Sequence, residues 1–204
     1  MKAAARICAA ALALLLAACG GSPPAANVGV YDLGPSAAAP ATKIAAVILV
    51  PTVAAPLWLD TTAIVYRLNY QDAARTRTYA QSRWAGTPAE MVGNQLRNRL
   101  ALVANGGVVG ATDGARADYA LRLELEDFSQ AFDAADASRG VVKVRATLID
   151  LAGRNVLAQR SFAVERPAPT ANADGAVRAL GQGSGVLVEQ VVAWTAASIP
   201  TRAK

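Results

Sequence analysis

Histidine is absent from this 204-residue chain, and cysteine occurs only twice, at Cys8 and Cys19. Without histidine, the chain has no Ser-His-Asp or Cys-His catalytic centre and lacks the commonest protein ligand for transition metals. Because neither cysteine lies beyond position 19, the rest of the chain has no disulfide and no thiolate for structural zinc. We therefore predict a fold that is stable through its hydrophobic core alone, with no metal and no cofactor.

Charged residues are also few, and neither sign is concentrated in one stretch. The 20 basic and 15 acidic residues give a net charge of +5, and the part after residue 18, without Lys2 and Arg6, has a net charge of +3. No block of lysine and arginine is present, which argues against a nucleic-acid-binding surface.

The N-terminal apolar run, Ile7–Leu16, is shorter than the roughly 20 residues that span a bilayer. Lys2 and Arg6 precede it, and Leu16-Ala17-Ala18-Cys19 follows it. Basic residues, a short apolar stretch and small residues, in this order, are typical of a secretory signal. Leu-Ala-Ala-Cys resembles a lipobox, so we expect cleavage before Cys19 and lipid on its thiol. More than one acyl chain gives stable attachment to a membrane.

Gly20 follows the expected lipidation site Cys19. In the sorting logic of proteobacterial lipoproteins, an aspartate there favours retention at the inner membrane. Its absence predicts the outer membrane, on the periplasmic face. We expect a signal peptide over 1–18, a lipidated tether with an edge strand (within Val28–Leu33) over 19–42, and one folded domain over 43–200.

Strand-like patterns occur in two groups along the chain. The continuous apolar run Ile44–Val50 predicts a strand that is buried on both faces. Alternation of apolar and polar residues predicts strands with one solvated face. The remaining predicted strands are Thr61–Leu68, Thr76–Arg83, the alternating stretches 121–126 and 142–148, and Asn155–Val164, which returns after a turn at Asp150–Arg154.

Two helices are expected, one after each group of strands. Thr87-Pro88-Ala89-Glu90 is a capping box with proline at the first helical position, and Asn105-Gly106-Gly107 predicts the stop. The apolar face of this first helix consists of Val92, Leu96, Leu100 and Val103. The order of strands, helix, strands and helix predicts a single α/β or α+β domain, with the two helices packed on a mixed sheet.

The second predicted helix has an apolar stripe from Val177 to Ser198, but Gly181, Gly183 and Gly185 fall within it. Each glycine costs a helix about 1 kcal/mol relative to alanine. Two interpretations remain open: the helix breaks at the glycines, or a neighbouring backbone packs close to it.

No set of residues predicts an enzyme. Glu124 and Glu126 could serve as a glycosidase pair, but a solvated strand face explains them better. Asp133 and Asp136 lie in a polar loop without the EF-hand pattern. The stretch 181–185 resembles a phosphate-binding loop only in its glycine content and lacks the following Gly-Lys-Ser/Thr.

The segment Leu57-Trp58-Leu59 places large apolar residues between two predicted strands. Large apolar residues in a loop can mark a surface for a partner or for lipid. The alternative is that Trp58 folds back over the sheet. Trp84, just before the capped helix, is expected in the core.

Several ordered motifs together resemble the ABC-type transport auxiliary lipoprotein family, which includes the outer-membrane lipoprotein partner of the paraquat-inducible lipid transport system. They extend over nearly the whole chain after the leader. These motifs are Tyr31-Asp32-Leu33-Gly34, Val47-Ile48-Leu49-Val50-Pro51, Leu59-Asp60 with Ile64-Val65-Tyr66-Arg67, Arg83-Trp84-Ala85, and Asp118-Tyr119-Leu121 with Phe128.

Two stretches depart from the family pattern. These departures bear on which subfamily the chain belongs to and which partner it uses. Asp60-Thr61-Thr62 stands where the family usually has Asp-Arg-Pro, and Gly86-Thr87-Pro88 replaces the usual Glu/Asp-Pro-Leu.

The resemblance implies an α/β fold and a subunit without catalysis. It also implies two partners, an inner-membrane ABC transporter and an MCE-type periplasmic substrate-binding protein, and a cargo of phospholipid or another hydrophobic molecule. Relatives in the family suggest ring-like homo-oligomers, whereas the sequence itself gives no indication of an oligomer. The alternative function is a stand-alone structural or outer-membrane assembly lipoprotein, because the signal and the tether suit both.

Overall fold

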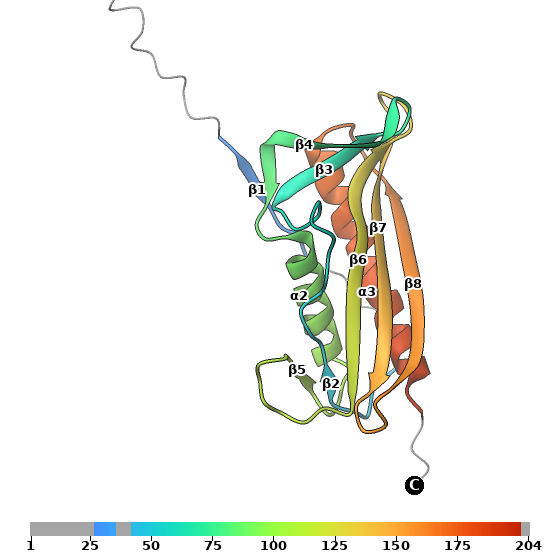
Figure 1. The fold of residues 1–204 in the computed structure, drawn as a ribbon. Coiled ribbons are helices and arrows are strands. Elements are labelled where there is room, and N and C mark those ends of the chain that lie inside the picture. Colours follow the sequence, from blue (N-terminus) through green and yellow to red (C-terminus); the bar gives the residue numbers. More distant parts are fainter. Residues whose placement is uncertain (1–26, 36–41, 201–204) are drawn as a thin grey trace, which may run out of the picture.

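A long three-stranded antiparallel ribbon forms one side of the molecule, and shorter strands extend it on the other side (Figure 1). The computed structural model describes residues 27–35 and 42–200. The elements are β1 (Gly29–Tyr31), β2 (Ile48–Leu49), β3 (Ala63–Leu68), β4 (Asp72–Trp84), α2 (Pro88–Ala101), β5 (Val108–Val109), β6 (Tyr119–Phe132), β7 (Ser138–Asp150), β8 (Asn155–Pro167) and α3 (Ala173–Ser198).

Strand β6 organises the eight-stranded mixed sheet because it is paired along both edges. On one edge it pairs with β7, which in turn pairs with β8, both antiparallel. On the other edge β2 runs parallel to the start of β6 and β3 runs parallel to its end. Strand β5 then flanks β2, while β4 flanks β3 and β1 pairs with the outer edge of β4. The expected edge strand near Val28–Leu33 is therefore confirmed as β1.

Both helices pack on the same face of the sheet, which gives a two-layer α/β fold. Helix α3 lies along β7 and β8, and α2 lies beside α3 (Figure 1). Side chains that alternate along the strands meet the apolar stripe of α3, and all are almost fully buried, which is the arrangement expected of a sheet with one covered face. The core includes Leu121, Leu125, Val144, Leu148, Leu180, Leu187 and Val191.

The capping box at the start of α2 is confirmed. The backbone amide of Glu90 donates to the Thr87 hydroxyl, and the carboxylate of Glu90 accepts from the Thr87 amide at 2.9 Å. The helix ends at Ala101 with Leu102 as its cap, before Asn105-Gly106-Gly107. Val103 is still buried, but its amide donates to Leu100 in a closing turn. Local hydrogen bonding therefore ends the helix ahead of the glycines.

The prediction of a strand over Ile44–Val50 is only partly right. The segment is extended, but only Ile48–Leu49 form a strand, and Ile44 makes an isolated bridge to Ala104. Burial alternates along it: Ile44, Ala46, Ile48 and Val50 are buried, whereas Ala45 is exposed and Val47 and Leu49 are half-buried. One side of this segment faces the core, so its continuous apolar run does not indicate burial on both faces.

Helix α3 runs unbroken from Ala173 to Ser198, so the three glycines do not interrupt it. Among the described residues, no helix combines the length and apolar character that a membrane crossing requires. The predicted signal peptide, Cys19 and the start of the tether lie outside the described residues.

Candidate binding groove beside the N-terminal segment

The segment that follows β1 is held between β4 and α3. Tyr31 pairs with Trp84 in a parallel register, and its carbonyl accepts from the Ala85 amide at 2.7 Å. The hydroxyl of Tyr31 donates to the Asp174 carboxylate in the first turn of α3 at 2.9 Å. That hydrogen bond to Asp174 raises the pKa of the Tyr31 phenol. Two elements that are distant in sequence are thus joined at the start of α3.

Gly181 is required where this segment crosses α3. A Cβ atom at Gly181 would lie 2.6 Å from the backbone oxygen of Leu33, which is closer than any side chain tolerates. Of the two interpretations left open by the sequence, the close approach of a neighbouring backbone is therefore the right one. Gly183 instead faces the sheet, where its Cβ would contact Val142 at 3.3 Å.

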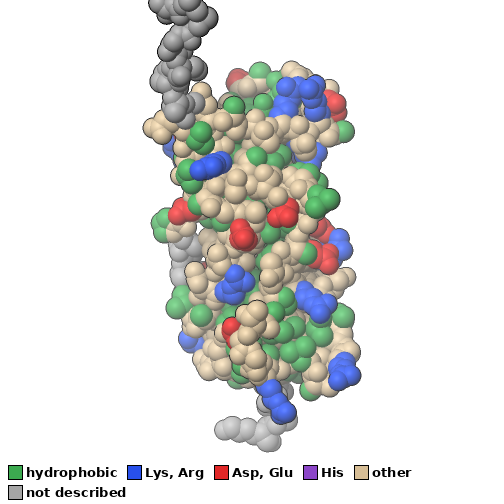
Figure 2. Space-filling view, turned by 60° about the vertical axis from the view of Figure 1, so that its left-hand side comes forward, with side chains coloured by type: hydrophobic (Ala, Val, Ile, Leu, Met, Phe, Trp, Pro, Cys, Tyr) green, Lys and Arg blue, Asp and Glu red, His purple; other side chains and the backbone are tan. Residues whose placement is uncertain are grey.

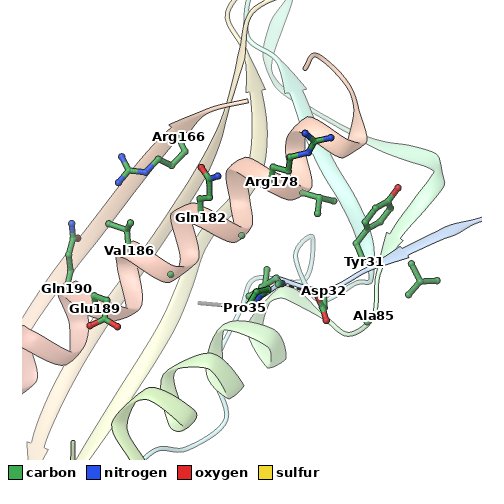
Figure 3. Close-up of a pocket in the computed structure, with 16 residues that line it drawn as sticks. Tyr31, Asp32, Pro35, Ala85, Arg166, Arg178, Gln182, Val186, Glu189 and Gln190 are labelled. Atoms are coloured by element: carbon green, nitrogen blue, oxygen red, sulfur yellow. Dashed lines mark hydrogen bonds between the residues drawn. The ribbon is translucent and has the colours of Figure 1, made fainter. Parts of the chain in front are cut away.

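A groove of about 1070 Å³ lies over this part of α3 (Figure 3). Apolar and small residues line much of it, because the helix carries no large side chain at Gly181 or Gly185. Polar residues of α3 and β8 occupy its rim. The lining residues include Leu33, Pro35, Val177, Gly181, Gly185, Val186, Arg166, Arg178 and Glu189.

The charged side chains that line the groove differ in whether they have a hydrogen-bond or ion-pair partner. Glu189 accepts two hydrogen bonds from Arg99 of α2, at 2.6 and 3.0 Å, and this half-buried ion pair joins the two helices. Asp32 accepts from the Gly34 amide at 2.8 Å in a local turn. In contrast, neither Arg166 nor Arg178 forms an ion pair with any carboxylate of residues 27–35 and 42–200.

Over the wider surface, charges of both signs are interspersed. Figure 2 shows basic and acidic side chains scattered between apolar ones, with basic groups gathered only at the upper end. The face shown therefore has no extended area of one sign, in agreement with the charge pattern of the sequence.

The three apolar residues predicted as a partner or lipid surface do not form one patch. Leu57 is 91% exposed, Trp58 is half-buried and Leu59 is fully buried. The guanidinium of Arg67 stacks over the Trp58 ring at 4.7 Å, a favourable contact between a cation and an aromatic face. Leu59 is therefore not accessible to a partner, and only Leu57 projects freely.

Three of the four carboxylates weighed as catalytic or metal candidates form ion pairs with arginine. Arg145 of β7 forms ion pairs with Glu124 at 3.2 Å and Glu126 at 2.5 Å. Asp133 pairs with Arg139, whereas Asp136 lies in the exposed turn between β6 and β7. The described part of the chain contains no group of three or more metal-ligating side chains.

Sequence reasoning missed the groove and its two arginines. Gly181 and Gly185 were the available signal, because glycines inside an otherwise good helix indicate a close approach or a depression. No sequence pattern indicated that Arg166 lines the groove. Its Pro-containing stretch predicts a loop, but the residue belongs to β8 in the structure.

Comparison with known proteins extends these observations. The model of the family of ABC-type transport auxiliary lipoprotein components matches residues 31–192. No curated protein matches the chain in sequence.

Two solved structures share its fold. Protein XCC0632 from Xanthomonas campestris is 18% identical with a TM-score of 0.72, and the match covers 84% of this chain and 95% of that one. The hypothetical protein CT253 from Chlamydia trachomatis is 10% identical with a TM-score of 0.56, covering 76% and 97%. Since the family model spans most of the sequence, including α2, all the long strands and most of α3, the chain belongs to the ABC-type transport auxiliary lipoprotein family.

Proposed function

We propose that this protein is the lipid-anchored auxiliary subunit of an MCE-type ABC system that moves phospholipid or another hydrophobic molecule between the membranes. Its place is the periplasmic face of the outer membrane, and it acts by docking, without catalysis. The observation that carries the proposal is the family match over residues 31–192. The lipobox at Leu16–Cys19 and the absence of histidine from the whole sequence support it.

The anchor and the domain are close together in this proposal. Residues 19–26 form the tether, because the chain from Gly29 onward is part of the sheet. The eight Cα–Cα steps from Cys19 to Asn27 reach at most about 29 Å when fully extended. The domain is therefore held near the membrane surface, within reach of a periplasmic partner that carries lipid to it.

Affinity purification from a detergent extract of the native cells tests the partner. The expected result is co-purification of an MCE-type protein and its ABC transporter, identified by mass spectrometry. Recovery of components of the barrel or lipopolysaccharide assembly machinery would instead support the alternative of an envelope assembly lipoprotein, and would contradict the proposal.

Cys19→Ala tests the anchor separately. The variant is expected to fold as the wild type does but to leave the membrane fraction, because no acyl chain is attached. Mass spectrometry of the wild-type protein should find an acylated Cys19 as its first residue. Membrane retention of the variant, or an unacylated wild type, would rule out this anchor.

A further inference from the structure

We propose that the outer edge of β4, where the tether joins the domain, is a second contact with the membrane and binds the headgroups of anionic phospholipids. This tether edge consists of Val28 and Val30 at β1 and of Arg75, Arg77 and Arg83 on β4. The inference rests on the proposed function, in which an acyl anchor holds the domain at a membrane. It goes beyond that function by assigning the surface that faces the lipid.

The tether edge is one border of the sheet. Strand β4 pairs with β3 along one side, and on its other side β1 pairs only with Ser82, Arg83 and Trp84. Within the described residues, Asp72–Gln81 therefore has no strand on that side. Its outward backbone amides and carbonyls require water or polar groups, and the headgroup region of a bilayer supplies both. Such a border suits the surface of a membrane and not its apolar interior.

The tether joins the domain at this border. Gly29 lies opposite Ser82 in the register of β1 and β4, and Figure 1 shows both strands at the upper end of the molecule, away from β2 and β5. Arg75 is seven residues from Ser82 along β4, which is at most about 24 Å in a strand. The tether extends at most about 29 Å. The arginines and the acyl anchor therefore reach the same membrane surface.

The β3–β4 hairpin carries the charge that an anionic surface attracts. Residues 63–84 contain four arginines and one aspartate, a net charge of +3, which equals that of the whole chain after residue 18. Uncharged residues separate these arginines, so they form no block in the sequence. None of the four forms an ion pair with a carboxylate of residues 27–35 and 42–200. Figure 2 shows basic side chains gathered at this upper end.

Acidic side chains are few along the tether edge. Asp72 is the one acidic residue of β4, and its carboxylate accepts from the Ala74 amide at 3.0 Å. The acidic residues of the β6–β7 turn lie at the tip end of the hairpin, where Leu68 pairs with Phe132. The tether joins at the other end of the hairpin, so these carboxylates do not face the membrane beside the anchor.

The charged groups extend past the border from both faces of β4. Arg77 lies opposite Tyr66, whose ring is 4.7 Å from that of Tyr79, and alternation along the strand places Arg75 on this same face. Arg83 instead lies opposite the exposed Val30. Arginine carries its charge at the end of a long flexible stem. Guanidinium groups from either face can therefore bend past an edge one strand thick toward the headgroups.

Vesicle co-sedimentation of the chain from residue 19 onward, carrying Cys19→Ala, tests the contact without the acyl anchor. The vesicles are one-third phosphatidylglycerol and two-thirds phosphatidylcholine, and pure phosphatidylcholine vesicles are the neutral control. One arginine near an anionic surface strengthens binding about fivefold. We therefore expect at least about tenfold stronger binding to the anionic vesicles. High salt should weaken it, because the charges are screened.

Two double variants with the same change of charge locate the contact. Arg75→Gln with Arg77→Gln should weaken binding to anionic vesicles at least about tenfold, whereas Arg75→Lys with Arg77→Lys should retain most of it. Arg122→Gln with Arg154→Gln removes two exposed arginines toward the other end of the long ribbon. It should leave binding within about twofold, because these charges lie more than a Debye length from the membrane. Equal melting temperatures show that all variants are folded.

A fluorescent probe reports the orientation of the domain. The chain after residue 19 has no cysteine, so a single introduced cysteine can carry an environment-sensitive dye. Ala80→Cys places the dye on the exposed part of β4, and Ala152→Cys places it in the exposed turn between β7 and β8. Binding to anionic vesicles should raise and blue-shift the emission of the dye at position 80 and leave that at position 152 unchanged.

Several outcomes would overturn the proposal. They are equal binding to the two kinds of vesicle, equal losses in the two double variants with glutamine, which would mean that only the net charge matters, or a larger response of the dye at position 152. Loss of the co-purified transporter in Arg75→Gln with Arg77→Gln, with unchanged vesicle binding, would mean that a protein occupies this edge.

The two proposals fail in different ways. Vesicle tests that fail while native Cys19 is acylated and the transporter is recovered would refute the tether edge and leave the proposed function standing. Vesicle binding together with an unacylated native Cys19 would refute the anchor and leave the tether edge standing.

Discussion

The two faces of β6 and β7 differ along 121–126 and 144–148, although they belong to the same strands. On the face under α3, Leu121, Val144 and Leu148 are fully buried. On the opposite face, Arg145 lies between Glu124 and Glu126 in exposed ion pairs. The difference shows that the alternating pattern sets where the core lies, while the charges on the other face stabilise little and mainly keep that surface solvated.

The largest effect is expected for Leu148→Ala, which empties a fully buried position of the covered face. The free energy of unfolding, measured by urea denaturation, should fall by about 2–5 kcal/mol. Ile149→Ala is the matched control, because the next residue points to the other face and is only half-buried. Equal losses for the two variants would contradict the contrast between the faces.

A smaller loss is expected for Arg99→Met, which breaks the half-buried pair between α2 and α3. Hydrogen bonds to charged groups contribute about 1.5–3 kcal/mol, and Glu189 would be left without its guanidinium partner. Arg97→Met, on the same helix with only a local bond to Asn94, should cost less than 1 kcal/mol in the same denaturation experiment, a loss typical of surface sites. If the two variants unfold at the same urea concentration, the interhelical pair does not stabilise the layer.

Tyr79 makes a pH-dependent contribution to the stability of the fold, on the face of the sheet that the helices cover. Its hydroxyl donates to the buried Gln130 at 2.6 Å, and Gln130 lies two residues after the core residue Phe128. Burial, with a smaller effect of Tyr66, raises the pKa of Tyr79 to about 12 from 10 in the unfolded chain. The stability that the neutral phenol contributes is therefore complete below pH 10 and is lost as the pH rises to 12.

The Tyr79→Phe variant tests this contribution. At pH 7 it should cost about 0.5–1.5 kcal/mol for the lost hydrogen bond. Between pH 10 and 12, its free energy of unfolding should fall less steeply than that of the wild type. Parallel pH profiles for the two proteins would show that the raised pKa does not contribute to stability.

The smallest effect is expected for Arg145→Met on the uncovered face. Exposed ion pairs contribute about 0–1 kcal/mol and are screened by salt. The loss should therefore be at most about 1 kcal/mol at low ionic strength and should shrink in 0.5 M sodium chloride. A loss that matches that of Leu148→Ala would mean that the charged face is a second stabilising layer.

Much of the fold could be predicted from local signals. The Thr87–Glu90 capping box predicted the start of α2, and alternation at 121–126 and 142–148 predicted the centres of β6 and β7, because these signals depend only on neighbouring residues. The extension of β6 to Phe132 was missed because a bulge between Leu125 and Asp127 shifts the alternation. The short strand β5 was also missed, since its existence depends on pairing with β2.

The candidate site was much less predictable. Leu57, Trp58 and Leu59 are adjacent in sequence, but their burial ranges from exposed to complete because the turn between Pro56 and Asp60 directs each side chain differently. The groove brings the segment at β1 against α3 and the end of β8, which follow more than 100 residues later in the sequence. No local pattern could have joined Tyr31 to Asp174 or Leu33 to Gly181.

The sequence by itself determined the chemistry that this protein lacks, the expected acylation at Cys19 and the alternation that buries one face of its strands. The amino-acid composition and the period of the apolar pattern depend only on residue types and their spacing, so they can be determined without the tertiary structure. The tertiary structure decided that Gly181 of α3 receives the Leu33 backbone and that the Tyr31 hydroxyl is hydrogen-bonded to Asp174. Such contacts form only when packing brings distant segments together, and sequence spacing cannot encode the distance between them.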